Sequence, residues 1–278
     1  MTQEAGADKY PAKRDTTTPG SRSLYDACVD LRDRVDAFLA EEDPGSEMLK
    51  GVQRQLRISM QVVEEVLAKY QFEQISISYN GGKDCLVLLI MILAGLARRY
   101  PSPPRPSSTT TNGSSPQFPA ELQAVYIVPP DPFPEVDEFV ASSSKDYHLE
   151  VLRYVLPMRQ GLEAYLADRP KVQAIFVGTR RTDPHGEKLT HSDRTDHGWP
   201  DFMRIHPVID WHYAEIWAFI RRIGVPYCPL YDLGYTSLGG VKDTHPNPHL
   251  KKEQGKGDGF RPAYELMADD EERLGRDK

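Results

Sequence analysis

The sequence predicts an α/β fold: a Rossmann-like, mostly parallel sheet with helices on both faces. Strand-like and helical runs alternate from residue 74 to residue 223, which is the pattern of βαβ units. The first strand-like run passes through a glycine turn into the apolar run 85–93. In folds of this class ligands bind at the carboxyl edge of the strands, so we expect the functional residues at that edge.

Two helices are expected before the first strand. Apolar residues recur at helical spacing between Leu24 and Phe38, and again between Leu56 and Tyr70. An acidic Pro-Gly segment at 41–45 separates the two. We expect these extra helices to form an N-terminal cap on the sheet. The polar residues 1–22 are expected to form a disordered tail.

The remaining elements follow in alternation. Strands are predicted at 74–79, 122–128, 149–155, 172–177 and 203–208, and helices at 83–99, 132–145, 158–166 and 212–223. Residues 101–119 consist mainly of Pro, Ser and Thr, which predicts a low-complexity loop inserted between a helix and a strand. We therefore expect residues 23–278 to form one domain that carries this insertion.

Bulk properties narrow the class of protein. The 278 residues carry a net charge of −7, which argues against a protein that follows a nucleic-acid backbone. The three cysteines lie far apart and form no Cys-x-x-Cys pair, so we expect a reducing, cytoplasmic location. The N-terminus lacks the apolar core of a secretion signal, and the apolar run 85–93 is too short to span a membrane. We expect a monomer with no membrane partner.

The segment Ser78-Tyr79-Asn80-Gly81-Gly82-Lys83-Asp84 is the most informative motif. Its glycines let backbone N–H groups approach a phosphate, and the dipole of the following helix favours negative charge. Lys83 adds a positive charge, while Asn80 and Asp84 offer oxygen ligands to Mg²⁺. A hairpin turn built on Asn-Gly is the alternative, but an apolar helix rather than a second strand follows.

This loop differs from both common phosphate-binding motifs. It has neither the spacing and Ser or Thr of the usual P-loop nor the Gly-x-Gly-x-x-Gly pattern. It resembles the pyrophosphatase-type loop of enzymes that cut ATP between its α and β phosphates. Cys85 stands where that loop commonly has serine.

A second set of polar residues follows the strand predicted at 172–177. Gly178-Thr179-Arg180-Arg181-Thr182-Asp183-Pro184 brings two arginines and a carboxylate to the same edge of the sheet. Further along the chain are the segments 195–207, 235–239 and 247–250, and the tail Glu272-Arg273-Leu274-Gly275-Arg276. Alone, residues 178–184 would indicate an ordinary solvated loop. Together with the glycine loop, they predict part of a binding site.

In this order the motifs resemble the eukaryotic FAD synthase family, also called FMN adenylyltransferases, from about residue 50 to the C-terminus. The chain is similar to the short fungal members. The resemblance implies an adenine nucleotide alpha hydrolase-like fold whose C-terminal tail folds back on the site. It also implies a Mg²⁺-dependent reaction in which the FMN phosphate attacks the α-phosphate of ATP, giving FAD and pyrophosphate. It leaves open that the product FAD stays bound.

The resemblance also implies roles for individual residues. The ATP phosphates would be bound by Ser78, Gly81, Gly82, Lys83 and Gly178. Asn80 and Asp84 would position Mg²⁺ and the α-phosphate, and Ile127 and Val128 would border the adenine.

On the flavin side, Asp183 would lie in the catalytic centre, with Arg180 and Arg181 binding FMN. Asp196 would face the flavin ring N–H, and Trp199 would stack on the ring. Arg204 would contact phosphate or flavin. Arg273 and Arg276 would fold back to bind phosphate, Arg276 also on the FMN side.

Three alternatives remain open at the level of sequence. A phosphoadenylyl-sulfate reductase would need a redox cysteine near its C-terminus, but no cysteine follows Cys228. A sulfur-inserting tRNA enzyme would favour paired cysteines and a basic face. A nucleotide-binding carrier without turnover would not need the intact Lys83 and Asp84.

Overall fold

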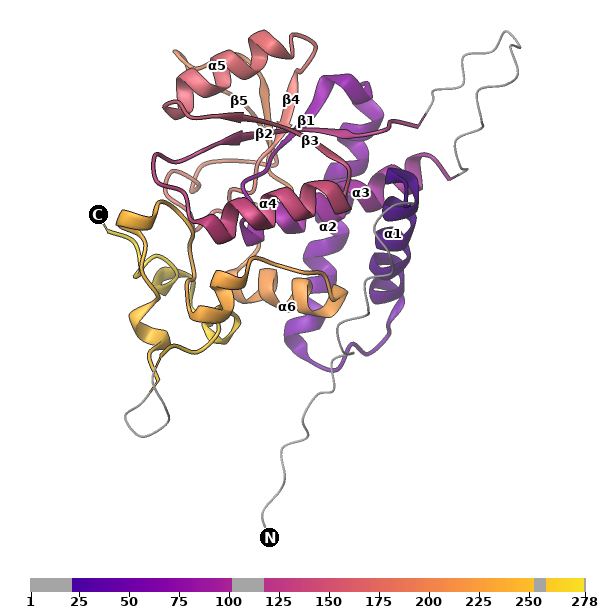
Figure 1. Ribbon diagram of the computed structural model, residues 1–278. Helices are drawn as coiled ribbons and strands as arrows, with labels where there is room; N and C mark the ends of the chain where they lie inside the picture. The colour runs from indigo at the N-terminus through magenta and orange to yellow at the C-terminus, as the bar shows by residue number, and fades with distance from the viewer. Residues whose placement is uncertain (1–21, 102–117, 253–258, 278) are drawn as a thin grey trace, which may run out of the picture.

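A six-stranded sheet lies at the centre of this computed structural model, which describes residues 22–101, 118–252 and 259–277 (Figure 1). The strands are β1 (Ile75–Ser78), β2 (Leu122–Ile127), β3 (Leu149–Tyr154), β4 (Ala174–Phe176), β5 (Ser192–Arg194) and β6 (Met203–Ile205). Their order is β3-β2-β1-β4-β6-β5, and every neighbouring pair is parallel except β5 with β6. The predicted α/β fold with a mostly parallel sheet is confirmed.

Helices cover both faces of the sheet. They are α1 (Leu24–Ala40), α2 (Glu47–Lys69), α3 (Lys83–Arg99), α4 (Pro134–Asp146), α5 (Met158–Asp168) and α6 (Tyr213–Ile223). α5 lies alone against β2 and β3 on one face, where Val125, Tyr165 and Ile175 form a small core. The other helices lie on the opposite face (Figure 1).

α3 is buried on nearly all sides. Every residue from Cys85 to Ala97 is buried, which is expected of a helix that is apolar all round. The sheet covers one side of α3, and α1, α2 and α6 pack against the others. We expected both N-terminal helices to cap the sheet; instead α1 packs chiefly on α3, because an apolar helix of this kind needs a second layer of helices around it.

The C-terminal segment has little regular structure but packs against α6 and the start of α3. Short 3₁₀ turns at Pro229–Leu233, Val241–Asp243, Pro248–Leu250, Ala263–Glu265 and Asp269–Glu271 carry the chain back beneath α4 (Figure 1). An aromatic group of Trp217, Tyr227, Tyr231 and Tyr264 joins this segment to α6 through edge-to-face contacts.

The tail predicted at 1–22 and the insertion at 101–119 fall, apart from their ends, outside the described residues. β5 was not predicted, because its residues Ser-Asp-Arg have no apolar alternation and pair only with the edge strand β6. Within the described ranges, no helix has the length and apolarity needed to cross a membrane.

Candidate active site

The turn between β1 and α3 brings two glycines to the carboxyl edge of the sheet. Gly81 has a φ of 75°, in the left-handed region, and a Cβ there would lie 2.9 Å from Val140 Cγ2. Gly82 is the N-cap of α3, and its N–H donates to Asn80 Oδ1 at 3.0 Å. This end of α3 therefore has the tight turn and the helix dipole that suit an anion.

The loop after β4 packs directly on this turn. Because β1 and β4 are neighbouring parallel strands, both loops leave the same edge of the sheet. A Cβ at Gly178 would lie 3.1 Å from the backbone carbon of Asp84. From the C-terminal segment, the hydroxyl of Tyr231 accepts a hydrogen bond from the Lys83 N–H at 2.9 Å. Contacts from two sides thus fix the start of α3.

A buried ionic cluster lies where these loops meet. Lys83 Nζ lies 3.0 Å from Asp84 Oδ2 and also contacts Glu272. Arg180 Nε lies 3.0 Å from Asp84 Oδ1, and Arg180 Nη2 contacts the second oxygen of Glu272. Lys83 is 2% exposed and Arg180 is fully buried, so both charges depend on these carboxylates for compensation.

Two further carboxylates complete the cluster. Those of Asp183 and Asp269 each lie 3.5 Å from a guanidinium nitrogen of Arg180. Asp183 also accepts the Arg180 backbone N–H at 2.8 Å. The cluster therefore joins two cations to four carboxylates, an excess of two negative charges, or of one when the His212 ring, 2.6 Å from Asp269, is protonated. Such an excess favours a divalent cation over an unaccompanied phosphate.

The pKa values follow from burial and these neighbours. Burial alone would raise the pKa of Asp84, but Lys83 and Arg180 outweigh it and hold the pKa below its usual value. Burial would lower the pKa of Lys83, but Asp84 and Glu272 raise it above its usual value. For Asp183, burial dominates and the pKa is raised, although Arg180 opposes it. Lys83 and Asp84 are therefore both charged at neutral pH.

The residues present fit a magnesium ion that is held mainly by the substrate. Asp84 Oδ1 is buried and forms an ion pair with Arg180 Nε at 3.0 Å, but it accepts no aligned hydrogen bond. Asn80 Oδ1 already accepts from Gly82 N–H and from Cys85 Sγ at 3.2 Å, so Asp84 Oδ1 is the oxygen of the two that accepts no hydrogen bond. Across the described ranges, no group of three or more His, Cys, Asp or Glu side chains could hold a metal ion. Mg²⁺ commonly takes one or two carboxylates together with phosphate oxygens, so this set suffices.

The residues predicted to lie around the adenine are at the end of the neighbouring strand β2. Ser78, which ends β1, pairs with Val125 of β2. A Cβ at Gly161 would lie 2.6 Å from Ile127 Cδ1, which places the Ile127 side chain against α5. Val128 is buried in the core on the other face. The adenine contacts of Ile127 and Val128 stay predictions.

Arg181, unlike Arg180, does not join the cluster. Its Nε lies 2.7 Å from Asp210 Oδ1, and its Nη1 donates to the carbonyl oxygens of Glu187 at 2.9 Å and Leu189 at 3.1 Å. Arg181 is half-exposed, whereas its neighbour is fully buried. Both arginines were predicted to bind FMN, but only Arg180 belongs to the buried cluster.

Asp196, Trp199 and Arg204, which were predicted to contact the flavin, form a separate group. Asp196 and Trp199 lie on the loop between β5 and β6, and Arg204 lies in β6. Arg204 Nη1 lies 3.4 Å from Asp196 Oδ2, and Trp199 is 43% exposed. Because β5 is antiparallel to β6, this loop leaves from the amino end of β6, not from the carboxyl edge. Phe202, at the end of the loop, packs with Tyr165, so the loop lies beside α5.

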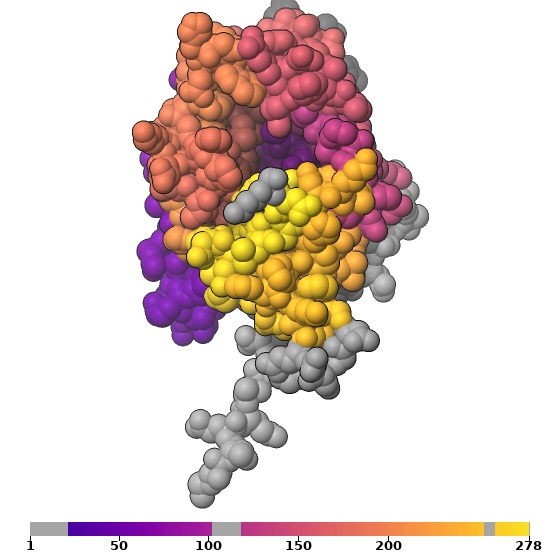
Figure 2. Space-filling model, turned by 90° about the vertical axis from the view of Figure 1, so that its left-hand side faces the viewer, coloured from indigo at the N-terminus to yellow at the C-terminus, as the bar shows by residue number. Residues whose placement is uncertain are grey.

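Figure 2 shows a hollow in the surface between three segments. Orange atoms of the region around residues 180–205 bound it on one side, and rose atoms of the β3–α5 region bound it on another. The yellow C-terminal tail closes it from below, and dark violet atoms from the first third of the chain lie at its floor. The segments that carry the predicted FMN and tail residues thus border one hollow.

The C-terminal tail reaches the site through residues other than the two predicted arginines. Arg276 lies 3.3 Å from Asp243, and a Cβ at Gly239 would lie 2.3 Å from its guanidinium carbon. Arg273 is exposed. The contacts with the cluster come instead from Glu272 and Asp269.

Sequence analysis missed Glu272 and Asp269. Both lie in the acidic run 269–272, where nothing distinguishes an ion-pairing carboxylate from a solvated one. The only available signal was the position of Glu272 beside Arg273 in the tail motif.

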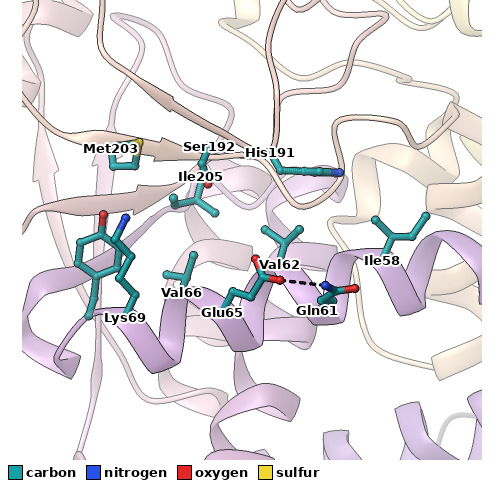
Figure 3. Close-up of a pocket in the computed structure, with 11 residues that line it drawn as sticks. Ile58, Gln61, Val62, Glu65, Val66, Lys69, His191, Ser192, Met203 and Ile205 are labelled. Carbon is teal, nitrogen blue, oxygen red and sulfur yellow. Dashed lines mark hydrogen bonds between the residues drawn. The ribbon is translucent and has the colours of Figure 1, made fainter.

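A separate cavity of about 330 Å³ lies between α2 and the strands β5 and β6 (Figure 3). Ile58, Val62 and Lys69 of α2 line one side, and Ser192 and Met203 line the other. It holds none of the predicted site residues, so we do not assign the reaction to it.

Comparisons with known proteins agree with the fold and the motifs. Residues 152–246 match the phosphoadenosine phosphosulfate reductase domain. The chain is 28% identical to an FMN adenylyltransferase of Candida glabrata whose crystal structure holds FAD and inorganic pyrophosphate. The TM-score is 0.83, over 92% of this chain and 100% of that chain. A crystal structure of the same enzyme with FMN and an ATP analogue gives a TM-score of 0.82, over 91% of this chain and 100% of that chain, again at 28% identity.

Curated relatives give the same result. The chain is 41% identical to a probable FAD synthase of Schizosaccharomyces pombe, over 83% of this chain and 82% of the relative. It is 35% identical to the flavin adenine dinucleotide synthase of Saccharomyces cerevisiae, over 76% and 72% respectively. A probable FAD synthase of Caenorhabditis elegans is 38% identical over 77% of this chain, which spans only 39% of that longer relative. With this identity and coverage, the chain belongs to the FAD synthase family.

Proposed function

We propose that this chain catalyses the reaction of its family, the transfer of AMP from ATP to FMN to give FAD and pyrophosphate. The observation that carries the proposal is the meeting of two loops at the ends of β1 and β4. The Asn-Gly-Gly-Lys-Asp loop and the Gly-Thr-Arg-Arg-Thr-Asp-Pro loop are joined there by the contact between Asp84 and Arg180. Family membership then supplies the two substrates, FMN and ATP.

The proposed reaction is an in-line displacement at the α-phosphorus of ATP. An oxygen of the FMN phosphate forms the new P–O bond, and the bond to the β-phosphate oxygen breaks, so pyrophosphate leaves. A phosphate monoester has a second pKa of about 6, so the nucleophile needs no general base at neutral pH. The protein must instead hold two anions close together and stabilise the charge that develops.

The nucleotide side of the site has groups suited to that task. We assign binding of the ATP phosphates to the turn at Gly81 and Gly82 and to the first turn of α3. Lys83 and Arg180 lie fixed at the same point, where their charge can stabilise the departing pyrophosphate. Asp84, with Asn80, would hold Mg²⁺, which when bound would neutralise charge on the phosphate oxygens.

On the flavin side we assign FMN to the hollow of Figure 2. Trp199 would stack on the ring system, Asp196 would accept a ring N–H, and Arg204 would bind the phosphate or the flavin. Asp183 lies at the cluster, where it would face the reacting phosphates.

The similarity to phosphosulfate reductases does not favour a reductase. All three cysteines are free and buried within the described part of the chain. Burial raises the pKa of Cys228 to about 11 and that of Cys85 to about 12, so neither thiol is a ready nucleophile. Free thiols also suit the reducing cytoplasm that we expect. For the oligomeric state, a monomer stays our prediction.

The test uses the purified chain with FMN, Mg²⁺ and ATP that is radiolabelled at either the α- or the γ-phosphate. Label from the α-phosphate should appear in FAD and label from the γ-phosphate in pyrophosphate, as read by chromatography. Addition of EDTA should stop both, and added Mg²⁺ should restore them. FAD that carries no α-label, or full turnover in EDTA, would contradict the proposed reaction or its metal respectively.

A further inference from the structure

The tail residue Glu272 is built into the site, although the proposed reaction gives it no role. Its carboxylate bridges Lys83 and Arg180, with one oxygen on each cation. Glu272 is 5% exposed, and the two cations that it joins come from the two loops of the site. A bridge of this kind fixes the relative position of two charges that are otherwise carried by flexible side chains.

The backbone around Glu272 is held by two buried polar side chains. Thr236 Oγ1 donates to the Glu272 carbonyl oxygen at 2.6 Å. Asn247 Nδ2 donates to the Glu271 carbonyl oxygen at 2.7 Å and to Thr236 Oγ1 at 2.9 Å. Thr236 is 1% exposed and Asn247 is fully buried. We call Thr236, Asn247 and Glu272 the tail latch.

We propose that Glu272 is a positioning residue for adenylyl transfer, and that the tail latch exists to hold its carboxylate between Lys83 and Arg180. This inference rests on the proposed function. It gives a role to the segments 235–239 and 247–250, which stand out in the sequence but include no proposed substrate contact.

A different role for the same carboxylate would be to stand in for a substrate phosphate and leave when ATP binds. The latch argues against this, because its hydrogen bonds hold the main chain and not only the side chain. The two roles also predict opposite effects on ATP binding. Removing a stand-in would lower the KM for ATP, whereas removing a positioning group would lower kcat.

The test compares Glu272→Gln with Glu272→Asp in steady-state FAD formation. Gln keeps the shape and loses the charge, and three carboxylates still surround the two cations, so the variant should fold. We expect kcat to fall about a hundredfold while the KM values for ATP and FMN stay within about threefold. Asp keeps the charge on a shorter side chain, so the kcat of Glu272→Asp should be at least about tenfold higher than that of Glu272→Gln. An unchanged kcat, a lowered KM for ATP, or no recovery by Asp would overturn the proposal.

Glu271→Gln is the matched control. Its side chain pairs with His249 at the surface and does not touch the cluster, while its carbonyl keeps the bond from Asn247. It should form FAD at the wild-type rate. If neither the wild type nor this control formed FAD, the proposed function itself would be rejected. If both formed FAD and Glu272→Gln did so at the same rate, only the role of Glu272 would be rejected.

Thr236→Val tests the latch without touching the cations. It removes the hydroxyl but keeps the shape, and we expect kcat to fall about tenfold. If the latch acts through Glu272, the double variant Thr236→Val/Glu272→Gln should be no slower than Glu272→Gln alone. Additive losses in the double variant would show that Thr236 acts independently and would overturn the latch.

Discussion

The guanidinium Nε of Arg180 lies 3.0 Å from Oδ1 of Asp84, and this ion pair ties the loop after β4 to the loop after β1. The two residues are distant in sequence, but their strands are parallel neighbours, so their loops leave one edge of the sheet together. Gly178 permits the approach, since a Cβ there would lie 3.1 Å from the Asp84 backbone. The close approach of these two loops therefore depends on strand order and on the absence of a side chain at Gly178.

Asp84→Asn should abolish FAD formation, with a loss of about three orders of magnitude or more. The variant removes the ionised oxygen available to Mg²⁺ and one partner of both buried cations. Circular dichroism should still show the wild-type fold. Asp33→Asn, on the solvent side of α1, is the control and should be fully active. Wild-type turnover in Asp84→Asn would remove this carboxylate from the mechanism.

Gly239→Ala and Gly275→Ala should separate an effect on activity from one on stability. A Cβ at Gly239 meets the movable guanidinium of Arg276 at 2.3 Å, so the variant should fold but displace that group. We expect kcat/KM to fall about tenfold with less than about 1 kcal/mol lost in the free energy of unfolding.

A Cβ at Gly275 meets the His245 carbonyl oxygen at 2.2 Å, which belongs to the backbone. That variant should lose about 2 kcal/mol or more in the free energy of unfolding, as measured in urea. Full activity in Gly239→Ala would show that the position of Arg276 does not matter to the reaction.

Much of the nucleotide side could be predicted from sequence, because its signals are local. The glycine turn, Lys83 and Asp84 are consecutive residues, and Arg180 and Asp183 follow another strand of the same parallel sheet, which places them at the same edge. The role of Glu272 could not be predicted, since it depends on where the folded tail returns. The different surroundings of Arg180 and Arg181 could not be predicted either, because only packing decides which of two adjacent side chains turns inward.

The elements of the fold were likewise predictable only where their sequence signals are local. The long apolar helix α3 and the strands β1 to β4 were recognisable from periodicity and apolar runs. β5 was not, because a polar edge strand gains its structure from pairing with β6. Its antiparallel direction also moves the loop that carries Asp196 and Trp199, so their position could not be deduced from the parallel-sheet rule.

Trp199→Ala should weaken FMN binding selectively. The side chain is 43% exposed, so its loss should leave the fold unchanged. Loss of ring stacking should raise the KM for FMN about three- to tenfold while the KM for ATP stays the same. Trp199→Phe keeps an aromatic face, so its KM for FMN should lie between those of the wild type and Trp199→Ala. Equal effects on both substrates would mean that Trp199 does not contact the flavin.

Stability should depend on pH through His206. Both of its ring nitrogens are buried without a hydrogen-bond partner, and burial, with Arg204, lowers the pKa from 6.5 to about 4. The folded state thus favours the neutral ring, so this contribution is fully present above pH 6.5 and is lost as the pH falls from there towards 4.

Urea unfolding of the wild type and His206→Phe between pH 7.5 and 4.5 checks this contribution. Over that range the wild type should lose more stability than the variant, by an amount on the order of 2–3 kcal/mol. Parallel pH dependence in the two proteins would show that His206 does not titrate in this way.

The most direct test is a crystal structure of the chain with FMN, Mg²⁺ and a non-hydrolysable ATP analogue. We predict the α-phosphorus beside the Gly81–Asp84 turn, with an FMN phosphate oxygen in line with it and Glu272 still bridging Lys83 and Arg180. A triphosphate bound elsewhere, with no nucleotide at the start of α3, would contradict the assigned site.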